Sequence, residues 1–293
     1  MSQTLRPKLR IGCKVNLYLE ITGVRENGYH ELESLFYPVS EPHDTLELTL
    51  AEDAPGLVLT CSDKALESPS NLVAKAYGAF AAASGWRPGL RAHLTKSIPS
   101  GAGLGGGSAD AAALLGWLNA NAGDKALGAS ELSALAAKLG ADVPFFLLNR
   151  PAWATGIGEK LEPAQCDLAG LAMLVAVPSE RVDTAWAYGA WDRLHAVQAG
   201  KGFTSPLTRL CPATMRPFCV SGTFTANSFE PVVFSHFPAV RLLKERLLAL
   251  GAAAAGMSGS GSAVFGIFRH AAWADAAASV LEGPDTAVFS ARL

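Results

Sequence analysis

The sequence is poor in cysteine and has no excess of positive charge. Its five cysteines are Cys13, Cys61, Cys166, Cys211 and Cys219. Their number is odd and no two have Cys-x-x-Cys spacing, so neither a zinc site nor a disulfide framework is suggested, and we expect reduced thiols in a cytoplasmic protein. The formal net charge of −2 argues against a nucleic-acid partner, because binding the phosphate backbone needs a basic surface.

Long apolar runs are missing as well. No stretch of about 18 apolar residues is free of charge or glycine, so we expect no transmembrane helix and no membrane partner. Residues 1–10 lack the apolar core of a signal peptide. The composition is nevertheless 49% hydrophobic over 293 residues, which is enough for one large or two ordinary domains with real cores.

Glycine, in contrast, is concentrated in one short stretch. Five of the seven residues 101–107 are glycine, and an alanine-rich segment with the composition of a helix follows at residues 109–118. Glycine is costly to order and offers no side chain to pack, so this density indicates a backbone that approaches a ligand closely. The start of a helix presents free N–H groups and the positive end of its dipole, so the segment is typical of a phosphate-binding loop.

The segment does not match three other kinds of glycine-rich sequence: a P-loop, a dinucleotide fingerprint or a flexible linker. A P-loop needs a lysine directly after the glycines, and none is present. A dinucleotide fingerprint fits Gly101, Gly103 and Gly106, but a loop and a second predicted helix at residues 130–139 stand where that fold needs a strand. A flexible linker would not carry Leu104 among its glycines or run straight into a helix.

The remaining pattern mixes strands and helices without regular alternation, which favours an α+β protein over a doubly wound sheet. A domain boundary is expected near residues 151–168, and residues 199–219 match no pattern. The predicted strands are residues 13–21, 46–50, 57–60, 90–98, 169–177 and 263–268. The predicted helices are residues 71–80, 109–118, 130–139, 184–191, 240–250 and 275–281.

Two pairs of residues near the N-terminus are candidates for a binding site. Lys14 and Asn16 share one face of the first predicted strand, and the alternative is that this face is simply solvated. Tyr29 and His30 follow Asn27-Gly28, a dipeptide that favours a tight turn. They lie where a ligand is stacked or hydrogen-bonded, or else in an ordinary hairpin turn with a packed tyrosine.

Two further polar residues adjoin predicted helices. Ser108 either caps the helix that follows the glycines or faces Mg²⁺ and the β-phosphate of a nucleotide. Asp142 lies in Gly140-Ala-Asp-Val-Pro144, just before an apolar run. It is either an acceptor for a turn or helix cap, or a catalytic carboxylate.

Taken in order, these motifs resemble one family. The chain carries Lys-x-Asn-Leu-x-Leu, Arg-x-x-Gly-Tyr-His, the glycine segment with Ser-Ala-Asp-Ala-Ala, Gly-Ala-Asp-Val-Pro and Ser-Gly-Ser-Gly-Ser, between Lys14 and Phe268. The glycine segments resemble those of the GHMP kinases. The Lys14–Asn16 and Gly28–His30 motifs resemble, within that superfamily, the 4-diphosphocytidyl-2-C-methyl-D-erythritol kinases.

The resemblance implies a fold and a reaction. The implied fold is a two-domain α+β GHMP kinase fold, with an ATP-binding domain over residues 1–158 like the second domain of ribosomal protein S5, a C-terminal domain over residues 159–293, and the active site in the interdomain cleft. The implied reaction, in the non-mevalonate isoprenoid pathway, transfers the γ-phosphoryl group of ATP, with Mg²⁺, to the 2-hydroxyl of a cytidylyl methylerythritol. We expect a monomer or weak homodimer.

The resemblance also implies residue roles. Lys14 and Asp142 match the catalytic lysine and base, and a lysine near a carboxylate would keep it ionised and offset charge at the transferred group. Nucleotide-binding positions match Pro99, Ser100, Gly101, Ala102, Gly103, Leu104, Gly105, Gly106, Gly107, Ser108 and Ala109. Substrate-binding positions match Asn16, Tyr29, His30, Thr184, Tyr188, Gly259 and Gly261.

One departure and two rival functions remain. The family usually has Pro-Ala before the catalytic lysine, where this chain has Gly12-Cys13. A different GHMP small-molecule kinase, such as a homoserine or mevalonate kinase, would lack the Gly-Tyr-His element. A non-catalytic nucleotide sensor of the same fold would be expected to have lost Lys14 or Asp142, and both are present.

Overall fold

The computed structural model describes residues 7–51, 56–196 and 225–293, which form two compact units that interleave along the sequence. Unit 1 comprises Met1–Cys13, His43–Ile98 and Gly105–Asn149, and unit 2 comprises Lys14–Pro42, Pro99–Leu104 and Arg150–Leu293. The first two strands, β1 (Lys8–Val24) and β2 (His30–Leu50), each contribute to both units. The division at residue 158 that the resemblance implies stays a prediction.

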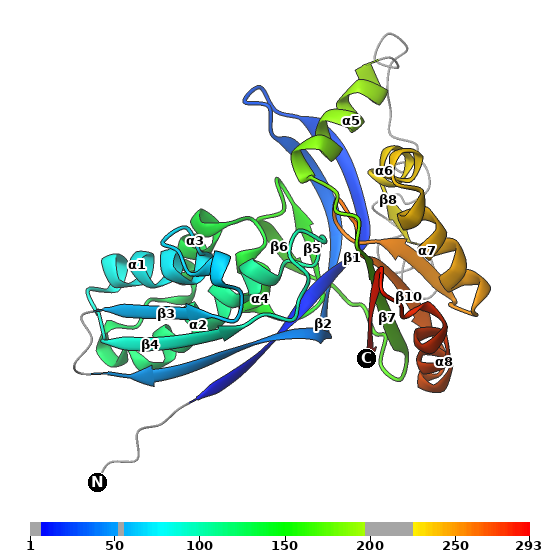
Figure 1. Ribbon diagram of the computed structural model, residues 1–293. Helices are drawn as coiled ribbons and strands as arrows, with labels where there is room; N and C mark the ends of the chain where they lie inside the picture. The colour runs from blue at the N-terminus through cyan, green and yellow to red at the C-terminus, as the bar shows by residue number, and fades with distance from the viewer. Residues whose placement is uncertain (1–6, 52–55, 197–224) are drawn as a thin grey trace. The chain divides into compact units, whose positions relative to one another are not determined.

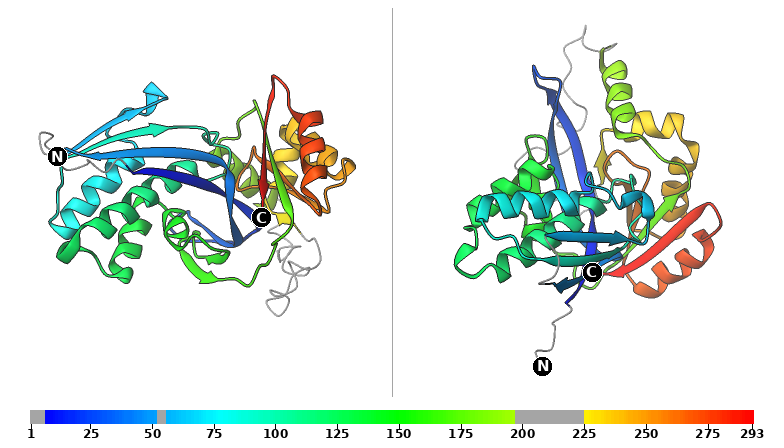
Figure 2. Two further views of the ribbon diagram at one scale, coloured as in Figure 1. Left: turned by 90° about the horizontal axis from the view of Figure 1, so that it is seen from below. Right: turned by 60° about the vertical axis from the view of Figure 1, so that its left-hand side comes forward.

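Unit 1 places its helices on one face of a sheet with the strand order β3-β4-β2 (Figures 1 and 2). β3 runs parallel to β4, and β4 runs antiparallel to β2 with Thr45 opposite Thr95. Its elements are β3 (Leu57–Cys61), η1 (Lys64–Leu66), α1 (Leu72–Ser84), β4 (Leu90–Thr95), α2 (Gly106–Asn121), η2 (Gly123–Lys125), α3 (Ala129–Leu139) and α4 (Val143–Leu148).

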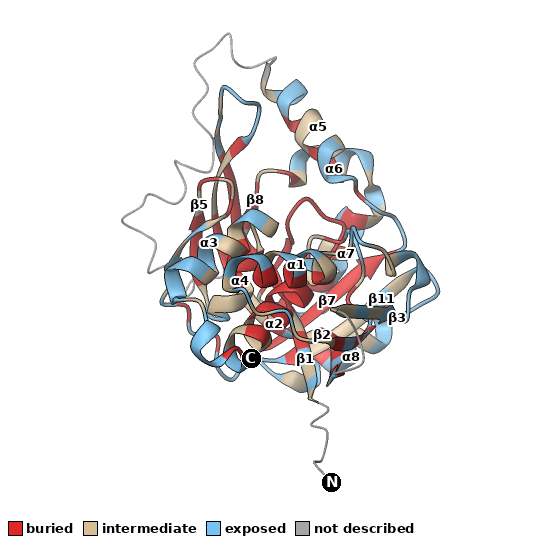
Figure 3. Cartoon of the chain, turned by 90° about the vertical axis from the view of Figure 1, so that its left-hand side faces the viewer, coloured by how far each residue is buried: buried red, intermediate tan, exposed pale blue. Residues whose placement is uncertain are grey.

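Local signals and apolar packing explain these elements. The Asn71 side chain accepts a hydrogen bond from the Val73 amide and caps α1, and Gly85 ends the helix in the left-handed conformation. The apolar faces of α1 and α2 cover the sheet in a core that includes Leu46 and Phe80 (Figure 3). After α2 the chain continues into η2 and α3 rather than a strand, which agrees with the exclusion of a dinucleotide fingerprint.

Unit 2 is built on an antiparallel sheet with the strand order β11-β7-β10-β9. Every residue of β7 is buried, as its apolar sequence predicts for a strand with neighbours on both sides. Helices α7 and α8 cover one face of this sheet (Figure 1). The elements of unit 2 are β5 (Ala152–Thr155), β6 (Lys160–Pro163), β7 (Ala172–Pro178), α5 (Thr184–Ala196), β8 (Ala226–Asn227), α6 (Glu230–His236), α7 (Pro238–Ala249), β9 (Ala254–Met257), β10 (Val264–Phe268), α8 (Ala271–Leu281) and β11 (Thr286–Arg292).

The structure differs from the predicted elements at several points. β1 and β2 are much longer than the strands expected at residues 13–21 and 46–50, and α2 begins three residues before Ala109. β11 was not predicted, because its residues are mostly half-buried and show no clear alternation. Residues 199–219, which matched no pattern, lie outside the described residues. None of the helices in the described part of the chain is both long and apolar enough to cross a membrane.

Candidate active site

The first glycine loop, residues 96–105, connects β4 to α2. Gly101, Gly103 and Gly105 have φ angles of 70°, 79° and 73°, which is the left-handed region that favours glycine. Gly105 is the N-cap residue of α2. Because glycine has no side chain, this position supplies no side-chain acceptor for the first amides of the helix. The interpretation of Ser108 as the helix cap is wrong, because the helix begins at Gly106 and Ser108 is its third residue.

The second glycine loop, residues 258–263 between β9 and β10, packs against the first loop backbone to backbone. A Cβ atom built on Gly103 would lie 2.2 Å from the carbonyl oxygen of Ser258. The Ser258 hydroxyl donates to the Gly103 carbonyl at 2.9 Å, and the Ala263 amide donates to the Ala102 carbonyl at 3.1 Å. Both segments are rich in glycine because their main chains approach more closely than side chains would allow.

Lys14 and Asn16 of β1 are buried, with 4% and 3% of their surfaces exposed, so the interpretation of a solvated face is wrong. The Lys14 ammonium donates to the Asn16 side-chain oxygen at 2.5 Å and lies 4.9 Å from the centre of the Phe36 ring. The Asn16 amide group donates to Ser34 Oγ at 2.8 Å, and its main-chain N–H donates to Ser258 Oγ at 3.2 Å. Both side chains are therefore held in place by several partners.

The main chain at Lys14 also touches the first glycine loop. Its N–H donates to the Leu104 carbonyl at 3.0 Å. Together with the contacts of Ser258, this hydrogen bond joins β1 and both glycine loops within unit 2. The structure thus brings together the Lys14–Asn16 pair and the two glycine loops, three features that the sequence predicts separately.

His30 is buried at the start of β2 and is held by α5. Its Nε2 lies 2.7 Å from the Asp192 carboxylate, and its ring lies 4.4 Å from the ring of Tyr188. Tyr188 also packs edge-on against Phe229. Tyr29, by contrast, is 59% exposed, so the interpretation of a packed tyrosine in a hairpin turn is wrong.

Asp192 is a residue of this region that sequence reasoning missed. It lies four residues after Tyr188 on α5, so both side chains share one face of that helix. The predicted helix ended at residue 191, one position before Asp192. A prediction that continued the helix past this residue would have placed the Asp192 carboxylate beside Tyr188.

The second glycine loop is held by a buried asparagine and by α5. The Asn227 side-chain amide donates to the carbonyls of Met257 and Gly259, at 2.8 Å each. The hydroxyls of Thr184 and Ser260 lie 2.9 Å apart. Gly259 and Gly261, which the resemblance assigns to substrate binding, both have positive φ angles. Asn227 had no signal in the sequence, since neither its position nor its neighbours form a recognisable motif.

Asp142 occupies the N-cap position of α4 in unit 1. Its side chain makes no cap hydrogen bond there, so the interpretation as a helix-cap acceptor is wrong. A Cβ atom built on Gly140 would lie 3.8 Å from the Ser108 hydroxyl. The segment that carries Asp142 therefore lies beside the first turn of α2.

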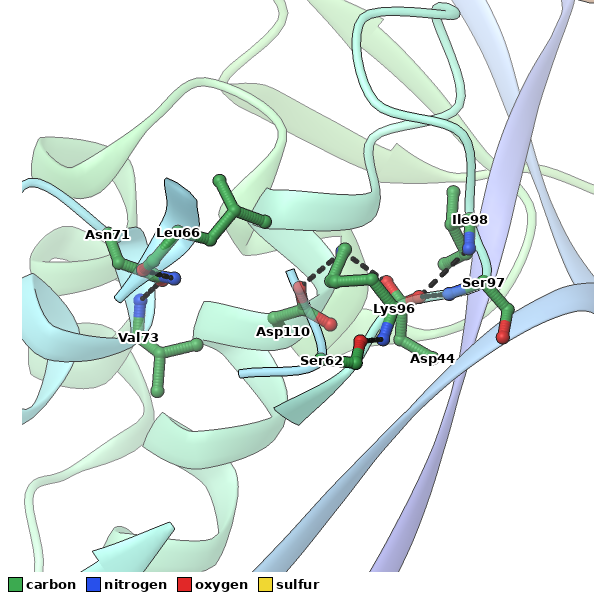
Figure 4. Close-up of polar contacts among 9 residues, drawn as sticks. All are labelled: Asp44, Ser62, Leu66, Asn71, Val73, Lys96, Ser97, Ile98 and Asp110. Carbon is green, nitrogen blue, oxygen red and sulfur yellow. Dashed lines mark hydrogen bonds and ion pairs between the residues drawn. The ribbon is translucent and has the colours of Figure 1, made fainter. Parts of the chain in front are cut away.

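A buried cluster of charges, also missed from the sequence, surrounds the start of the first glycine loop (Figure 4). The Lys96 ammonium contacts the carboxylates of Asp44 and Asp110, the latter at 2.7 Å. Asp44 and Asp110 are both buried, and 11% of the Lys96 side chain is exposed. Lys96 lies three residues before Pro99, where the glycine motif begins, and this position was a signal that the sequence offered.

The ionisation of this cluster is shifted by burial and by its own members. Burial raises the pKa of Asp110 to about 7; Lys96 opposes the shift and Asp44 adds to it. Burial lowers the pKa of the Lys96 ammonium, but its contacts with Asp110 and Asp44 outweigh burial and leave the pKa above its ordinary value. Oδ1 of Asp110 has no hydrogen-bond partner in the described part of the chain.

Three of the five cysteines lie in the described part of the chain. Cys13, Cys61 and Cys166 are free and buried, and burial raises the pKa of Cys166 to about 12. Cys211 and Cys219 lie outside the described residues. Among the residues that the structure describes, no group of three or more His, Cys, Asp or Glu side chains is arranged to hold a metal ion.

Family models identify the class of protein to which this fold and these loops belong. The model of the GHMP kinase N-terminal domain matches residues 71–150, and that of the GHMP kinase C-terminal domain matches residues 215–284. A crystal structure of homoserine kinase from Cytophaga hutchinsonii has the same fold, with a TM-score of 0.73 at 17% identity over 99% of this chain and 96% of that one. The fold is therefore the α+β fold of the GHMP kinases.

More similar relatives narrow the family. The chain is 48% identical to the 4-diphosphocytidyl-2-C-methyl-D-erythritol kinase of Solidesulfovibrio magneticus, over all of this chain and 98% of the relative. It is 49% identical to that of Nitratidesulfovibrio vulgaris, over 96% of each chain. A crystal structure of 4-(cytidine 5'-diphospho)-2C-methyl-D-erythritol kinase has a TM-score of 0.80 at 34% identity, covering 97% of this chain and 98% of that one. The chain belongs to this family of GHMP kinases, as its motifs predict.

Proposed function

We propose that this chain is an ATP-dependent kinase that phosphorylates the 2-hydroxyl of 4-diphosphocytidyl-2-C-methyl-D-erythritol, in the non-mevalonate route to isoprenoid precursors. The observation that carries the proposal is 48% identity over the full chain to a relative named for this activity. The Gly28–His30 element supports it, because a buried His30 beside an exposed Tyr29 is suited to recognise a pyrimidine.

The first glycine loop is the proposed site for the triphosphate. Its three left-handed glycines and the start of α2 fit such a group, since main-chain amides and a helix dipole both favour phosphate oxygens. Mg²⁺, when bound with ATP, neutralises phosphate charge. Ser108, in the first turn of α2, is the proposed protein ligand on that side.

Asp142 is proposed as the general base and Lys14 as the charge-stabilising cation. Asp142 stands in the Gly-Ala-Asp-Val-Pro motif that matches the position of the family's catalytic base, and a carboxylate within reach of the substrate hydroxyl can take its proton. Lys14 is held by Asn16, so its ammonium has a defined position from which to offset negative charge on the transferred phosphoryl group. Asp142 belongs to unit 1 and Lys14 to unit 2, and the two roles are proposed separately.

The cytidylyl substrate is proposed to bind in unit 2. Tyr29 offers an exposed ring for stacking on cytosine, and His30 offers hydrogen bonds at a ring that Asp192 orients. Asn16, Thr184, Tyr188, Gly259 and Gly261 complete the proposed substrate contacts. Replacing Tyr29 with alanine should therefore raise KM for the cytidylyl substrate far more than KM for ATP, and equal effects on both would argue against stacking.

A comparison of substrates tests the function directly. ATP consumption is measured with the cytidylyl methylerythritol, with homoserine and with mevalonate, at matched concentrations. Turnover of the first alone is expected, and preference for either of the others would assign the chain to another kinase activity. Asp142→Asn serves as the control for contaminating kinases, because it should lower kcat by about 10²–10⁴-fold or more. A chain that binds ATP but turns over none of the three would be a nucleotide-binding protein without this activity.

A further inference from the structure

The position of Lys96 in the sequence suggests that it binds phosphate, but its surroundings in the structure argue against this role. A lysine next to a glycine-rich phosphate loop is usually expected to reach the phosphates. Here the ammonium lies between the carboxylates of Asp44 and Asp110, with only 11% of the side chain exposed (Figure 4). An ammonium with two carboxylates in contact offers little net positive charge to a further anion.

Asp44 holds the entrance of the first glycine loop. Its Oδ1 accepts hydrogen bonds from the main-chain amides of Ser97 and Ile98, at 2.6 Å and 2.9 Å. These two residues lead directly into the glycine motif. Charge-assisted hydrogen bonds of this kind are about twice as strong as neutral ones, so the path of the main chain is firmly set here.

The same group of atoms also touches the exit of the loop. A Cβ atom built on Gly106, the first residue of α2, would lie 2.9 Å from Ile98 Cγ2 and 3.5 Å from Asp44 Oδ2. Lys96, at the entrance, reaches Asp110 on the second turn of α2 at 2.7 Å. The entrance and the exit are therefore joined twice, by the contact of Ile98 with Gly106 and by the ion pair of Lys96 with Asp110.

We infer that Asp44, Lys96 and Asp110 form a clasp that closes the two ends of the first glycine loop and so positions its amides for the nucleotide triphosphate. In this role Lys96 is a positioning residue and not a phosphate ligand. The inference rests on the proposed nucleotide binding of the loop. It makes ATP affinity depend on two carboxylates whose own charge would repel phosphate.

Direct nucleotide binding provides the first test. The dissociation constant of a non-hydrolysable ATP analogue with Mg²⁺ is measured by calorimetry for the wild-type chain, Lys96→Met, Asp44→Asn and Asp110→Asn. The clasp predicts weaker binding for both Lys96→Met and Asp44→Asn, by about tenfold or more. Lys96→Met leaves two buried carboxylates without their cation, and Asp44→Asn removes the charge that strengthens the hydrogen bonds from the Ser97 and Ile98 amides. If Asp44→Asn binds the analogue as tightly as the wild type or more tightly, the inference is overturned. Without a clasp, removing a negative charge near the loop should strengthen the binding of an anion.

Lys8→Met is the matched control. Lys8 also lies in unit 1 and pairs with a carboxylate, Glu47 at 3.1 Å, but 66% of its side chain is exposed. It should bind the analogue within about twofold of the wild type, because an exposed pair contributes little. Melting curves of all variants establish that each is folded at the temperature of the binding measurement. Asp110→Asn keeps an oxygen that accepts from Lys96 but removes the ion pair between the two ends of the loop, so it remains informative if the other two variants unfold. Weaker binding by a folded Asp110→Asn chain supports the clasp, and binding as tight as in the wild type counts against it.

A double variant separates the clasp from a direct contact. Lys96→Met combined with Asp44→Asn should bind the analogue no more weakly than Lys96→Met alone, because both changes disrupt one unit. Fully additive losses would overturn the inference. Steady-state kinetics give the second readout: KM for ATP should rise in Lys96→Met while KM for the cytidylyl substrate stays unchanged.

These measurements keep the two proposals apart. Binding of the analogue does not involve the acceptor, so the clasp stands or falls by the variants even if the wild-type chain phosphorylates another substrate. If the wild-type chain turns over the cytidylyl substrate and the clasp variants bind the analogue normally, the proposed function stands and the clasp is refuted. If even the wild-type chain fails to bind the analogue, the proposed nucleotide site fails, and the clasp fails with it.

Discussion

The two glycine loops meet the same structural requirement with different chemistry. A segment rich in glycine has few side chains with which to hold its own shape, so its neighbours must hold it. The ends of the first loop are held by the buried charges of Asp44, Lys96 and Asp110. The second loop is held mainly by neutral groups, the amide of Asn227 and the hydroxyl of Thr184, while Glu230 accepts from the Met257 amide at its start. The first loop therefore differs in being held by a buried carboxyl group, Asp110, whose pKa is raised to about 7.

The charge balance explains why this difference matters. With both carboxylates ionised, the cluster around Lys96 carries one net negative charge, and with Asp110 protonated it carries none. Such a change next to the start of α2 alters the electrostatic potential where phosphate is proposed to bind. The neutral contacts of Asn227 undergo no comparable change near neutral pH.

The largest expected effect comes from the contact between the two loops. Gly103→Ala should lower the free energy of unfolding by about 3 kcal/mol, because its Cβ would lie 2.2 Å from the Ser258 carbonyl oxygen and its φ of 79° is strained for alanine. Gly101→Ala is the control, since its φ is 70° but nothing lies within 4 Å of its Cβ. Urea unfolding measures both, and equal losses would mean that backbone strain alone, and not the contact between loops, decides the cost.

A smaller effect is expected from the neutral support of the second loop. Asn227→Ala should cost about 2 kcal/mol, since it leaves the carbonyls of Met257 and Gly259 without their donor. It should also raise KM for the cytidylyl substrate. Asn119→Ala is the control, because Asn119 bonds the main chain of Leu127 in unit 1, away from both loops. If both variants change KM alike, the effect of Asn227 is one of general stability.

The charged support should make stability depend on pH. Because the pKa of Asp110 is raised from 3.8 to about 7 in the folded chain, folding favours its protonated form. The free energy of unfolding should therefore fall as pH rises from about 4 to about 7 and level off above that. Asp110→Asn should remove this fall, as measured by urea unfolding at several pH values. Curves for the wild type and Asp110→Asn that run parallel would show that another group carries the pH dependence.

The smallest expected effect concerns one hydroxyl pair. Thr184→Val removes the hydrogen bond to Ser260 and should cost about 1 kcal/mol, with a modest rise in KM for the cytidylyl substrate. Thr184→Ser keeps the hydroxyl and should restore both values. Should Thr184→Ser behave like Thr184→Val, the methyl group and not the hydrogen bond supports the second loop.

Local sequence was sufficient for the features that depend on neighbouring residues. The glycine loop, the turn before Tyr29 and most helices follow from composition and spacing over a few positions. The boundaries were less accurate: Gly106 and Gly107 were assigned to the loop, although they form the first turn of α2. Glycine is a poor helix former, and here the close packing of Gly106 against Ile98 outweighs that preference.

The residues that hold the two glycine loops could not be predicted from the sequence, because their contacts depend on how distant segments of the chain pack together. Asp44 meets Lys96 across 52 residues only because β2 pairs with β4 so that Thr45 lies opposite Thr95. Asn227 lies on β8, which pairs with β1, and it meets the second glycine loop across about 30 residues through the fold of unit 2. Polar residues without a motif become functional candidates only when the fold brings them beside one.

The shared strands have a consequence for how this chain is engineered or recombined. β1 and β2 pass through both compact units, so neither unit is one continuous piece of sequence. A hybrid made with a single crossover between two relatives would join a strand segment from one parent to packing partners from the other. Hybrids that keep each unit from one parent therefore need crossovers inside β1 and β2 and also at both ends of residues 99–104 and before Arg150, where the chain again passes from one unit to the other.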